Sequence, residues 1–228
     1  MTFPLDTSLS SLSTSSAERE EEPIPFNIRS GILEGLSGSY YTLTIVDLIY
    51  QGITDLTEGC FNNVPGLIEL NLQGNSLKRI SGTIFNKLIN LQRLYLGAND
   101  LTSVSKKAFH GLPLRELSLN TNQLSYLSRK IFHGQHQLQL LFLNENKIRM
   151  LRALHFEHVI SLKELYLHEN PLEHIDETSF DLLINIRKIN LCIHKRIALP
   201  KERFSHLTYL EEFKVHDDEF NEVNLVKN

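Results

Sequence analysis

The sequence predicts an α/β solenoid of about eight repeats, bent into a horseshoe. A parallel β-sheet should line its concave side, and irregular, short 3-10 or helical segments its convex side. Apolar residues recur from Leu43 onward in one pattern with a period of 23 or 24 residues, and a Phe lies 18 residues after the start of seven successive repeats. A fixed period of this length indicates a solenoid, because each repeat buries its apolar face only against its neighbours. The repeats begin at Leu43, Leu67, Leu91, Leu114, Leu138, Leu162, Ile186 and Leu210.

The residues before the repeats have a different composition. Residues 1–22 are rich in Ser and Thr and then acidic, so they offer too little apolar surface to offset the entropy of ordering, and we expect a disordered tail. This tail lacks the basic start and the apolar core of a signal peptide. We interpret residues 23–42 as a cap over the first repeat and residues 43–228 as the repeat domain, whose last repeat is incomplete.

Each repeat should contribute one strand to the concave sheet. With the first residue of a repeat counted as position 0, we predict strands at positions 2 to 6, as in residues 69–73 and 164–168. Side chains alternate along a strand, so positions 3 and 5 should point into the core and positions 2, 4 and 6 outward. The Phe residues should stack behind the sheet as a column that contains Phe61, Phe85, Phe109, Phe132, Phe156, Phe180 and Phe204.

A polar amide recurs at position 8. The chain must turn there inside the stack, where backbone N–H and C=O groups need partners, and an Asn side chain can both donate and accept. We therefore predict a structural ladder formed by Asn75, Asn99, Asn122, Asn146 and Asn170. The ladder breaks at Gln51, His194 and Asp218, and irregular backbone is expected over residues 194–199.

Segments such as LQRLYLGANDL (91–101) and LKELYLHENPL (162–172) resemble the leucine-rich repeat motif. The period and the Phe column are similar to the typical class of this family, found in Toll-like receptors and in extracellular matrix and receptor proteins. The resemblance covers roughly residues 41–228. It implies a protein ligand on the concave face, a receptor, immune or matrix role, and an extracellular or secreted location. It does not identify the ligand.

This chain departs from the extracellular class in two ways, because it has neither a signal peptide nor cysteine-rich caps. A fragment of a larger ectodomain would explain both departures. The alternative is a cytoplasmic scaffold or adaptor subunit that uses the same concave face. An uncapped C-terminal end could also be covered by the terminal segment EVNLVKN, or could associate end to end with another molecule.

Three outward aromatic residues at position 4 mark the predicted binding surface. Exposed apolar groups tend to mark interfaces, and Tyr is enriched among residues that dominate binding energy. The alternative reading is that aromatic residues suit strands in general. The candidate partner-binding residues are Tyr95, Asn120, Leu140, Phe142, Asn144, Glu145, Tyr166 and His168.

The charge balance bears on the class of partner. The net charge is −4 for the whole chain and also for residues 1–40, so residues 41–228 are balanced. At position 2, Glu69, Arg93 and Glu116 alternate in sign, and so do Glu164, Lys188 and Glu212, which predicts a self-neutralised ladder across neighbouring strands. A basic nucleic-acid footprint and a polybasic membrane patch are not expected. No run of 18 apolar residues occurs, so no membrane-spanning helix is expected either.

Catalytic and metal chemistry have little support. At position 6, His168, Cys192 and His216 follow one another on successive strands and form a weak candidate zinc site. No CxxC, HExxH, G-x-S-x-G, P-loop or GxGxxG motif is present, so we expect no enzyme activity, metal or cofactor. Cys60 and Cys192 lie more than five repeats apart, too far for a disulfide.

Overall fold

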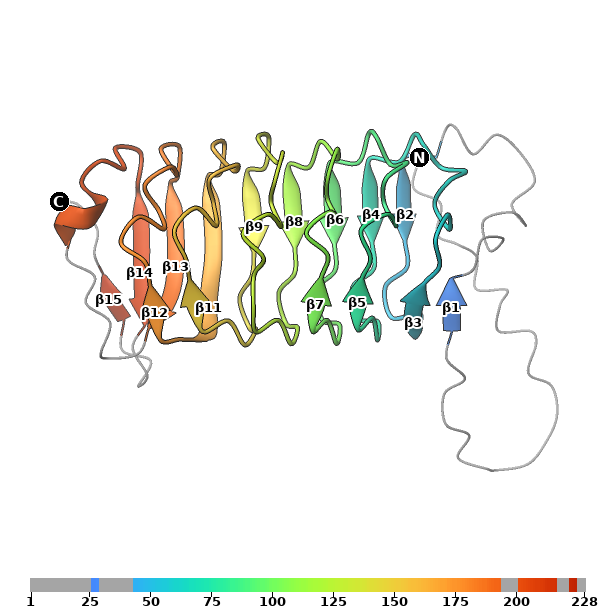
Figure 1. The fold of residues 1–228 in the computed structure, drawn as a ribbon, viewed down its shortest axis with the longest axis horizontal. Coiled ribbons are helices and arrows are strands. Elements are labelled where there is room, and N and C mark those ends of the chain that lie inside the picture. Colours follow the sequence, from blue (N-terminus) through green and yellow to red (C-terminus); the bar gives the residue numbers. More distant parts are fainter. Residues whose placement is uncertain (1–25, 29–42, 194–200, 217–221, 225–228) are drawn as a thin grey trace, which may run out of the picture.

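The computed structural model describes residues 26–28, 43–193, 201–216 and 222–224. Their strands line up side by side along one long axis (Figure 1). The main sheet has nine strands, and the eight that belong to the repeats are all parallel. This confirms the predicted solenoid. These eight strands are β2 (Ile45–Asp47), β4 (Glu69–Asn71), β6 (Arg93–Tyr95), β8 (Glu116–Ser118), β9 (Leu140–Phe142), β11 (Glu164–Leu172), β13 (Lys188–Ile193) and β14 (Glu212–His216).

The strands of the main sheet begin at the predicted position 2, but β2, β4, β6, β8 and β9 each have three residues instead of five. They end early because the chain already bends toward the amide turn, where position 7 adopts a left-handed backbone. The residues at position 7 have φ between 50° and 66°: Tyr50, Gly74, Ala98, Thr121, Glu145 and Glu169. Non-glycine residues rarely adopt this conformation, so the repeat pattern did not reveal it.

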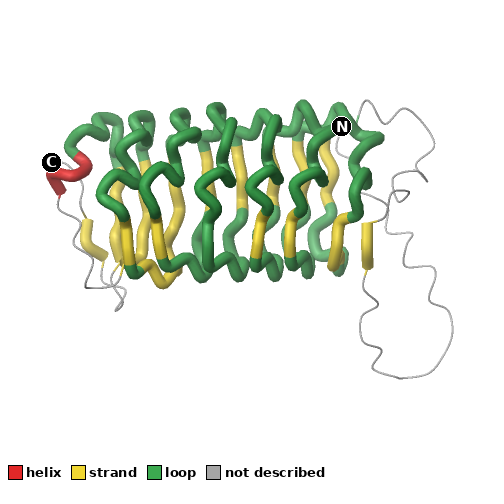
Figure 2. Tube along the Cα trace, in the orientation of Figure 1, coloured by secondary structure: helices red, strands yellow, loops and turns green. Residues whose placement is uncertain are grey.

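The convex side consists mainly of turns, as expected (Figure 2). Short parallel pairs of strands lie there. They are β5 (Arg79–Ile80) with β7 (Ser103–Val104), and β10 (Met150–Leu151) with β12 (His174–Ile175). One 3-10 helix, η3, covers Lys201–Phe204.

Strands from outside the regular array pair with both ends of the solenoid. Strand β1 (Phe26–Ile28) pairs in parallel with β3 (Ile53–Leu56), and β15 (Glu222–Asn224) pairs antiparallel with β14. Strand β15 pairs along the edge of β14. It belongs to the terminal segment EVNLVKN, which was one of the expected covers of the C-terminal end. Residues 194–199, for which irregular backbone was expected, lie outside the described residues.

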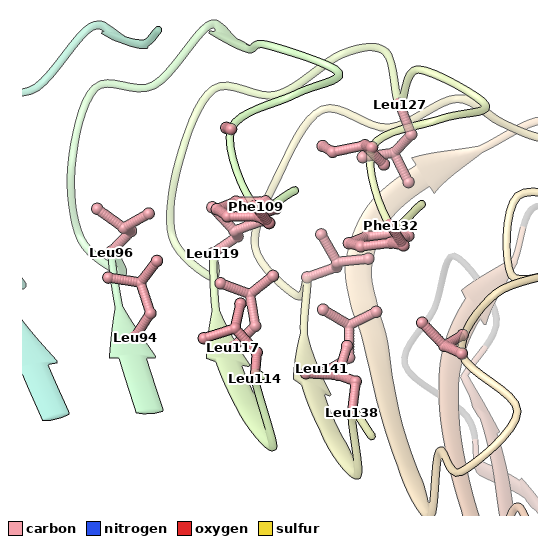
Figure 3. Close-up of a cluster of buried hydrophobic side chains, with 14 of the residues drawn as sticks. Leu94, Leu96, Phe109, Leu114, Leu117, Leu119, Leu127, Phe132, Leu138 and Leu141 are labelled. Carbon is pink, nitrogen blue, oxygen red and sulfur yellow. The ribbon is translucent and has the colours of Figure 1, made fainter. Parts of the chain in front are cut away.

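The core lies between the sheet and the turns behind it. Leu94, Leu96, Leu117 and Leu119 point backward from their strands, and Phe109 closes the space from the opposite turn (Figure 3). The ring centroids of Phe132 and Phe156 are 6.2 Å apart, as are those of Phe156 and Phe180. Every member of the Phe column is buried, which confirms it as part of the core.

Gln135 interrupts the apolar pattern at position 21. Its side chain is 1% exposed, and its Nε2 donates to the carbonyl oxygen of Phe109 at 2.7 Å. The donor of this buried amide is therefore satisfied, whereas its Oε1 is buried without a hydrogen-bond partner among the described residues.

The asparagine ladder forms as predicted. In one rung, Asn146 Oδ1 accepts from the N–H of Leu124 at 3.0 Å, and Nδ2 donates to the carbonyl oxygens of Leu119 at 2.9 Å and Leu143 at 3.1 Å. The other rungs repeat these bonds between equivalent residues, and their side chains are Asn75, Asn99, Asn122 and Asn170. Each amide therefore joins its own repeat to the preceding one.

Candidate functional site

The outward aromatic residues stand on the concave sheet at positions set by the strand register. Tyr166 lies opposite Phe142, and Ser118 separates Phe142 from Tyr95. The rings of Phe142 and Tyr166 are stacked, with centroids 4.8 Å apart and planes 10° apart. Both side chains are half-buried, so part of each ring is accessible to a partner.

A hollow of about 460 Å³ lies over these strands, and we call it the concave hollow. Six of the eight predicted partner-binding residues line it, whereas Leu140 and Glu145 do not. The sequence reasoning did not select Gln73, Glu116 or Ser118, although all three occupy outward positions of the repeat. The lining residues are Gln73, Tyr95, Glu116, Ser118, Asn120, Phe142, Asn144, Tyr166 and His168.

A chain of hydrogen bonds orders the polar rim of the concave hollow. Ser118 Oγ lies 2.5 Å from Asn120 Oδ1, and Asn120 Nδ2 donates to Thr121 Oγ1 at 3.1 Å. Thr121 Oγ1 and Asn144 Nδ2 then donate to the two carboxylate oxygens of Glu145, each at 3.1 Å. Glu145 thus helps to hold the lining residues in place, although it does not itself line the concave hollow.

The two tyrosines of the concave hollow remain protonated at neutral pH. Burial, reinforced by the nearby Glu116 carboxylate, raises the pKa of Tyr95 to about 12. Burial and the hydrogen bond from its hydroxyl to Glu164 Oε2, at 2.5 Å, also raise the pKa of Tyr166. Lys188 Nζ lies 5.4 Å from the centroid of the Tyr166 ring, within range of a cation–π contact. The surface therefore combines aromatic rings with the hydroxyl groups of the two tyrosines.

The predicted charge ladder flanks this surface. Arg93 Nε lies 2.6 Å from Glu69 Oε2, and Lys188 Nζ lies 3.2 Å from Glu212 Oε2. The strand register places every neighbouring pair of the two predicted triplets side by side. Most of these charges are thus compensated within the sheet.

The candidate zinc residues are not placed in regular steps. Cys192 pairs with His216 across β13 and β14, but the register between β11 and β13 shifts after Leu167, so His168 has no such pairing with Cys192. Within the described part of the chain, no group of three or more His, Cys, Asp or Glu side chains could hold a metal ion. The side chain of His216 lies outside it, so the trio stays a prediction.

His155 differs from the other histidines whose burial the structure describes, because it is buried, with 2% of its surface exposed. Its Nδ1 accepts from the backbone N–H of Arg152 at 3.1 Å, which favours the neutral imidazole. Burial, followed by the charge of Arg152, lowers the pKa of His155 below its ordinary value.

We predict that His155 makes the fold sensitive to acid. Because the pKa of His155 is lower in the folded state, its stabilising contribution is present above an unfolded pKa of about 6.5 and is lost as the pH falls from that value through the lower folded pKa. In urea titrations at pH 7 and pH 5, His155→Leu should lose less stability than the wild type over this interval. His206→Gln, an exposed change, should keep the wild-type dependence. An unchanged pH dependence in His155→Leu would contradict the prediction.

No helix in the described residues is both long and apolar enough to cross a membrane.

Comparisons with known families and proteins agree with this architecture. The family described as "Leucine rich repeat" matches in overlapping segments at residues 42–101, 70–124, 89–148, 113–172 and 136–192. Rabbit (Oryctolagus cuniculus) decorin is 30% identical over 127 residues, which are 56% of this chain and 34% of decorin. Human (Homo sapiens) fibromodulin is 42% identical over 52 residues, which are 22% of this chain and 14% of fibromodulin.

A solved structure also resembles the fold. The chain in the crystal structure of a TLR13–ssRNA13 complex aligns with a TM-score of 0.60 and 27% identity. The alignment covers 77% of this chain and 28% of the TLR13 chain. The chain thus spans about a third or less of the length of each of these proteins.

Proposed function

Since the chain belongs to the leucine-rich repeat family, we propose that it is a non-enzymatic recognition module that binds a protein partner through its concave face. The observation that carries this proposal is the stacked and partly exposed pair Phe142 and Tyr166 beside the concave hollow. Aromatic side chains in a partly desolvated site, surrounded by polar groups, are typical of the residues that dominate binding energy.

The ordered rim supports the same function. Asn120 and Asn144 are held by the hydrogen bonds that lead to Glu145, so little conformational entropy is lost when a partner binds. The protonated Tyr95 hydroxyl interacts with the Glu116 carboxylate, and its oxygen can accept a hydrogen bond from the partner.

We place the module in a receptor, immune or matrix setting outside the cell. The similarity to decorin, fibromodulin and TLR13 supports this setting. The intracellular scaffold expected as the alternative would use the same face, so the origin of the partner decides between the two.

The test is affinity capture with mass spectrometry, using the full chain as bait in conditioned medium and in cell lysate separately. The site variant carries Tyr95→Ser, Phe142→Ser and Tyr166→Ser. The matched control carries Tyr→Ser changes at three exposed tyrosines away from the hollow. These control positions, with exposed fractions of 77%, 59% and 59%, are Tyr50, Tyr126 and Tyr209.

The expected result is a protein that the wild type and the control retain and the site variant loses, although all three give the same circular dichroism spectrum. Recovery from medium supports the extracellular setting, and recovery from lysate alone supports the scaffold. If the site variant retains every partner, the concave proposal is wrong. Nuclease treatment identifies a partner held through RNA, the kind of ligand in the TLR13–ssRNA13 complex, and that outcome would also contradict direct protein binding.

A further inference from the structure

The back of the solenoid carries a strong excess of positive charge in repeats two to five. The segments behind the sheet, from position 9 to position 21, contain ten Lys and Arg residues and only two acidic residues, Asp100 and Glu157. All ten cations are exposed. We call them the convex basic patch, which consists of Lys78, Arg79, Lys87, Lys106, Lys107, Arg129, Lys130, Lys147, Arg149 and Arg152.

The convex basic patch has defined boundaries along the solenoid axis. The equivalent segment of repeat one, residues 52–64, has two acidic residues and no Lys or Arg. The equivalent segment of repeat six, residues 171–183, has four acidic residues and no Lys or Arg. These two acidic segments carry six negative charges against the net eight positive charges of the basic centre, and the balanced charge of residues 41–228 therefore hides the patch.

The cations of neighbouring repeats lie close together. On this side of the molecule, equivalent rings one repeat apart have centroids about 6 Å apart, as measured for His110 and His133 at 6.0 Å. Lys106 and Lys107 occupy the same positions in repeat three as Arg129 and Lys130 in repeat four. The charges of repeats three and four therefore form two short rows, one at position 15 and one at position 16.

Most of these cations have no ion-pair partner in the part of the chain that the structure describes. Among the described residues, Arg149 is the one member of the patch with an ion-pair partner, Glu173, whose Oε1 lies 2.7 Å from Arg149 Nη1. Concentrated charge of one sign repels itself and lowers stability, whereas it attracts a polymer of the opposite sign.

We propose that the convex basic patch binds a linear sulfated polysaccharide. The patch as a whole extends over four repeats, which fits a long polyanion better than a small ligand. A single-stranded nucleic acid is less well matched, because such ligands are held by aromatic side chains on which bases stack. Of the exposed large hydrophobic side chains on the back of repeats two to five, only Tyr126 is aromatic, and Arg152 already lies 5.9 Å from its ring centroid.

The experiment measures binding of the full chain to a size-defined heparin oligosaccharide over a series of NaCl concentrations. The site variant is Lys107→Gln, Arg129→Gln and Lys130→Gln. The control removes the same charge from exposed position 1 residues at the start of the strands, with Arg115→Gln, Lys163→Gln and Arg187→Gln. Circular dichroism checks that both variants are folded.

The wild type and the control should bind alike, and the site variant should bind roughly tenfold more weakly at low salt. The slope of log affinity against log salt should fall by about three in the site variant, one for each contact removed. Binding should also decrease with a desulfated oligosaccharide.

Three outcomes would overturn the proposal. The first is an equal loss in the site variant and the control, which would show attraction to charge in general. The second is the absence of binding by the wild type. The third is tighter binding of a single-stranded RNA of equal charge at the same salt concentration, which would assign the patch to nucleic acid.

Discussion

Phe132→Ala should lower the free energy of unfolding by about 3–5 kcal/mol. The side chain is 1% exposed, and its ring is stacked on that of Phe156 with the planes 16° apart. The cavity cannot collapse easily, because the turns on both sides are fixed to their neighbours by the asparagine ladder. Urea unfolding followed by circular dichroism measures the loss.

Two further variants separate the cavity from other effects. Phe132→Leu keeps most of the volume and should cost less than the truncation. Ile89→Ala removes an apolar side chain that is 64% exposed and should change stability by less than about 0.5 kcal/mol. If Phe132→Ala proved as mild as Ile89→Ala, the Phe column would not be a structural spine. Because repeats contact only their neighbours, the truncation could also split unfolding into two steps.

Asn146→Ala should cost about 3 kcal/mol, since it leaves the buried N–H of Leu124 without a partner and removes one of two donors from each of two buried carbonyl oxygens. The N–H of Leu124 loses its acceptor, and the carbonyl oxygens of Leu119 and Leu143 lose a donor. Water cannot easily replace the amide, because these bonds lie inside the stack. The same urea titration gives the value.

The control for the amide is an asparagine on the surface. Asn185 Nδ2 donates to the carbonyl oxygen of Ile160 at 2.7 Å in an exposed position, so water can take over this bond in Asn185→Ala. We expect a loss below about 1 kcal/mol for this variant. Equal losses at Asn146 and Asn185 would show that the ladder contributes nothing beyond ordinary surface hydrogen bonds.

The sequence predicted those features that recur in every repeat. Burial of Leu94 or Phe109 follows from periodicity, because solvent exclusion depends on residue type and spacing. The left-handed residues at position 7 could not be read this way, because Ala98, Thr121 and Glu145 share no chemistry. Their conformation is imposed by the hydrogen bonds of the amide that follows. The register shift after Leu167 could not be predicted from the repeat pattern either, because it depends on how β11 and β13 pair.

The candidate site was predicted in part. Outward position and aromatic character sufficed to select Tyr95, Phe142 and Tyr166, whose role in binding is still a proposal. Ser118 was overlooked because a small hydroxyl carries no signal until its neighbours are known. Ser118 lies in the concave hollow between two aromatic side chains of the neighbouring strands, and only the strand register shows this position.

The balanced total charge of residues 41–228 conceals the convex basic patch. A sum over residues 41–228 treats the front and the back of the solenoid as one surface. The positive charges at positions 15 and 16 of repeats three and four are visible in the sequence. They are separated from the charges of the concave face only when each position is assigned to one face of the solenoid.

The parallel strands pair one after another along a single axis. This arrangement determines how the protein would respond to a pulling force. Force applied at the two ends of the sheet would load every pair of neighbouring strands in series, since each described strand of the array pairs with the strands of the adjacent repeats. The molecule would then lengthen by peeling, one turn after another. Each turn of about 24 residues would release roughly 80 Å of chain at about 3.3 Å per residue. In a tissue under strain, such a chain would yield gradually and keep its remaining turns intact.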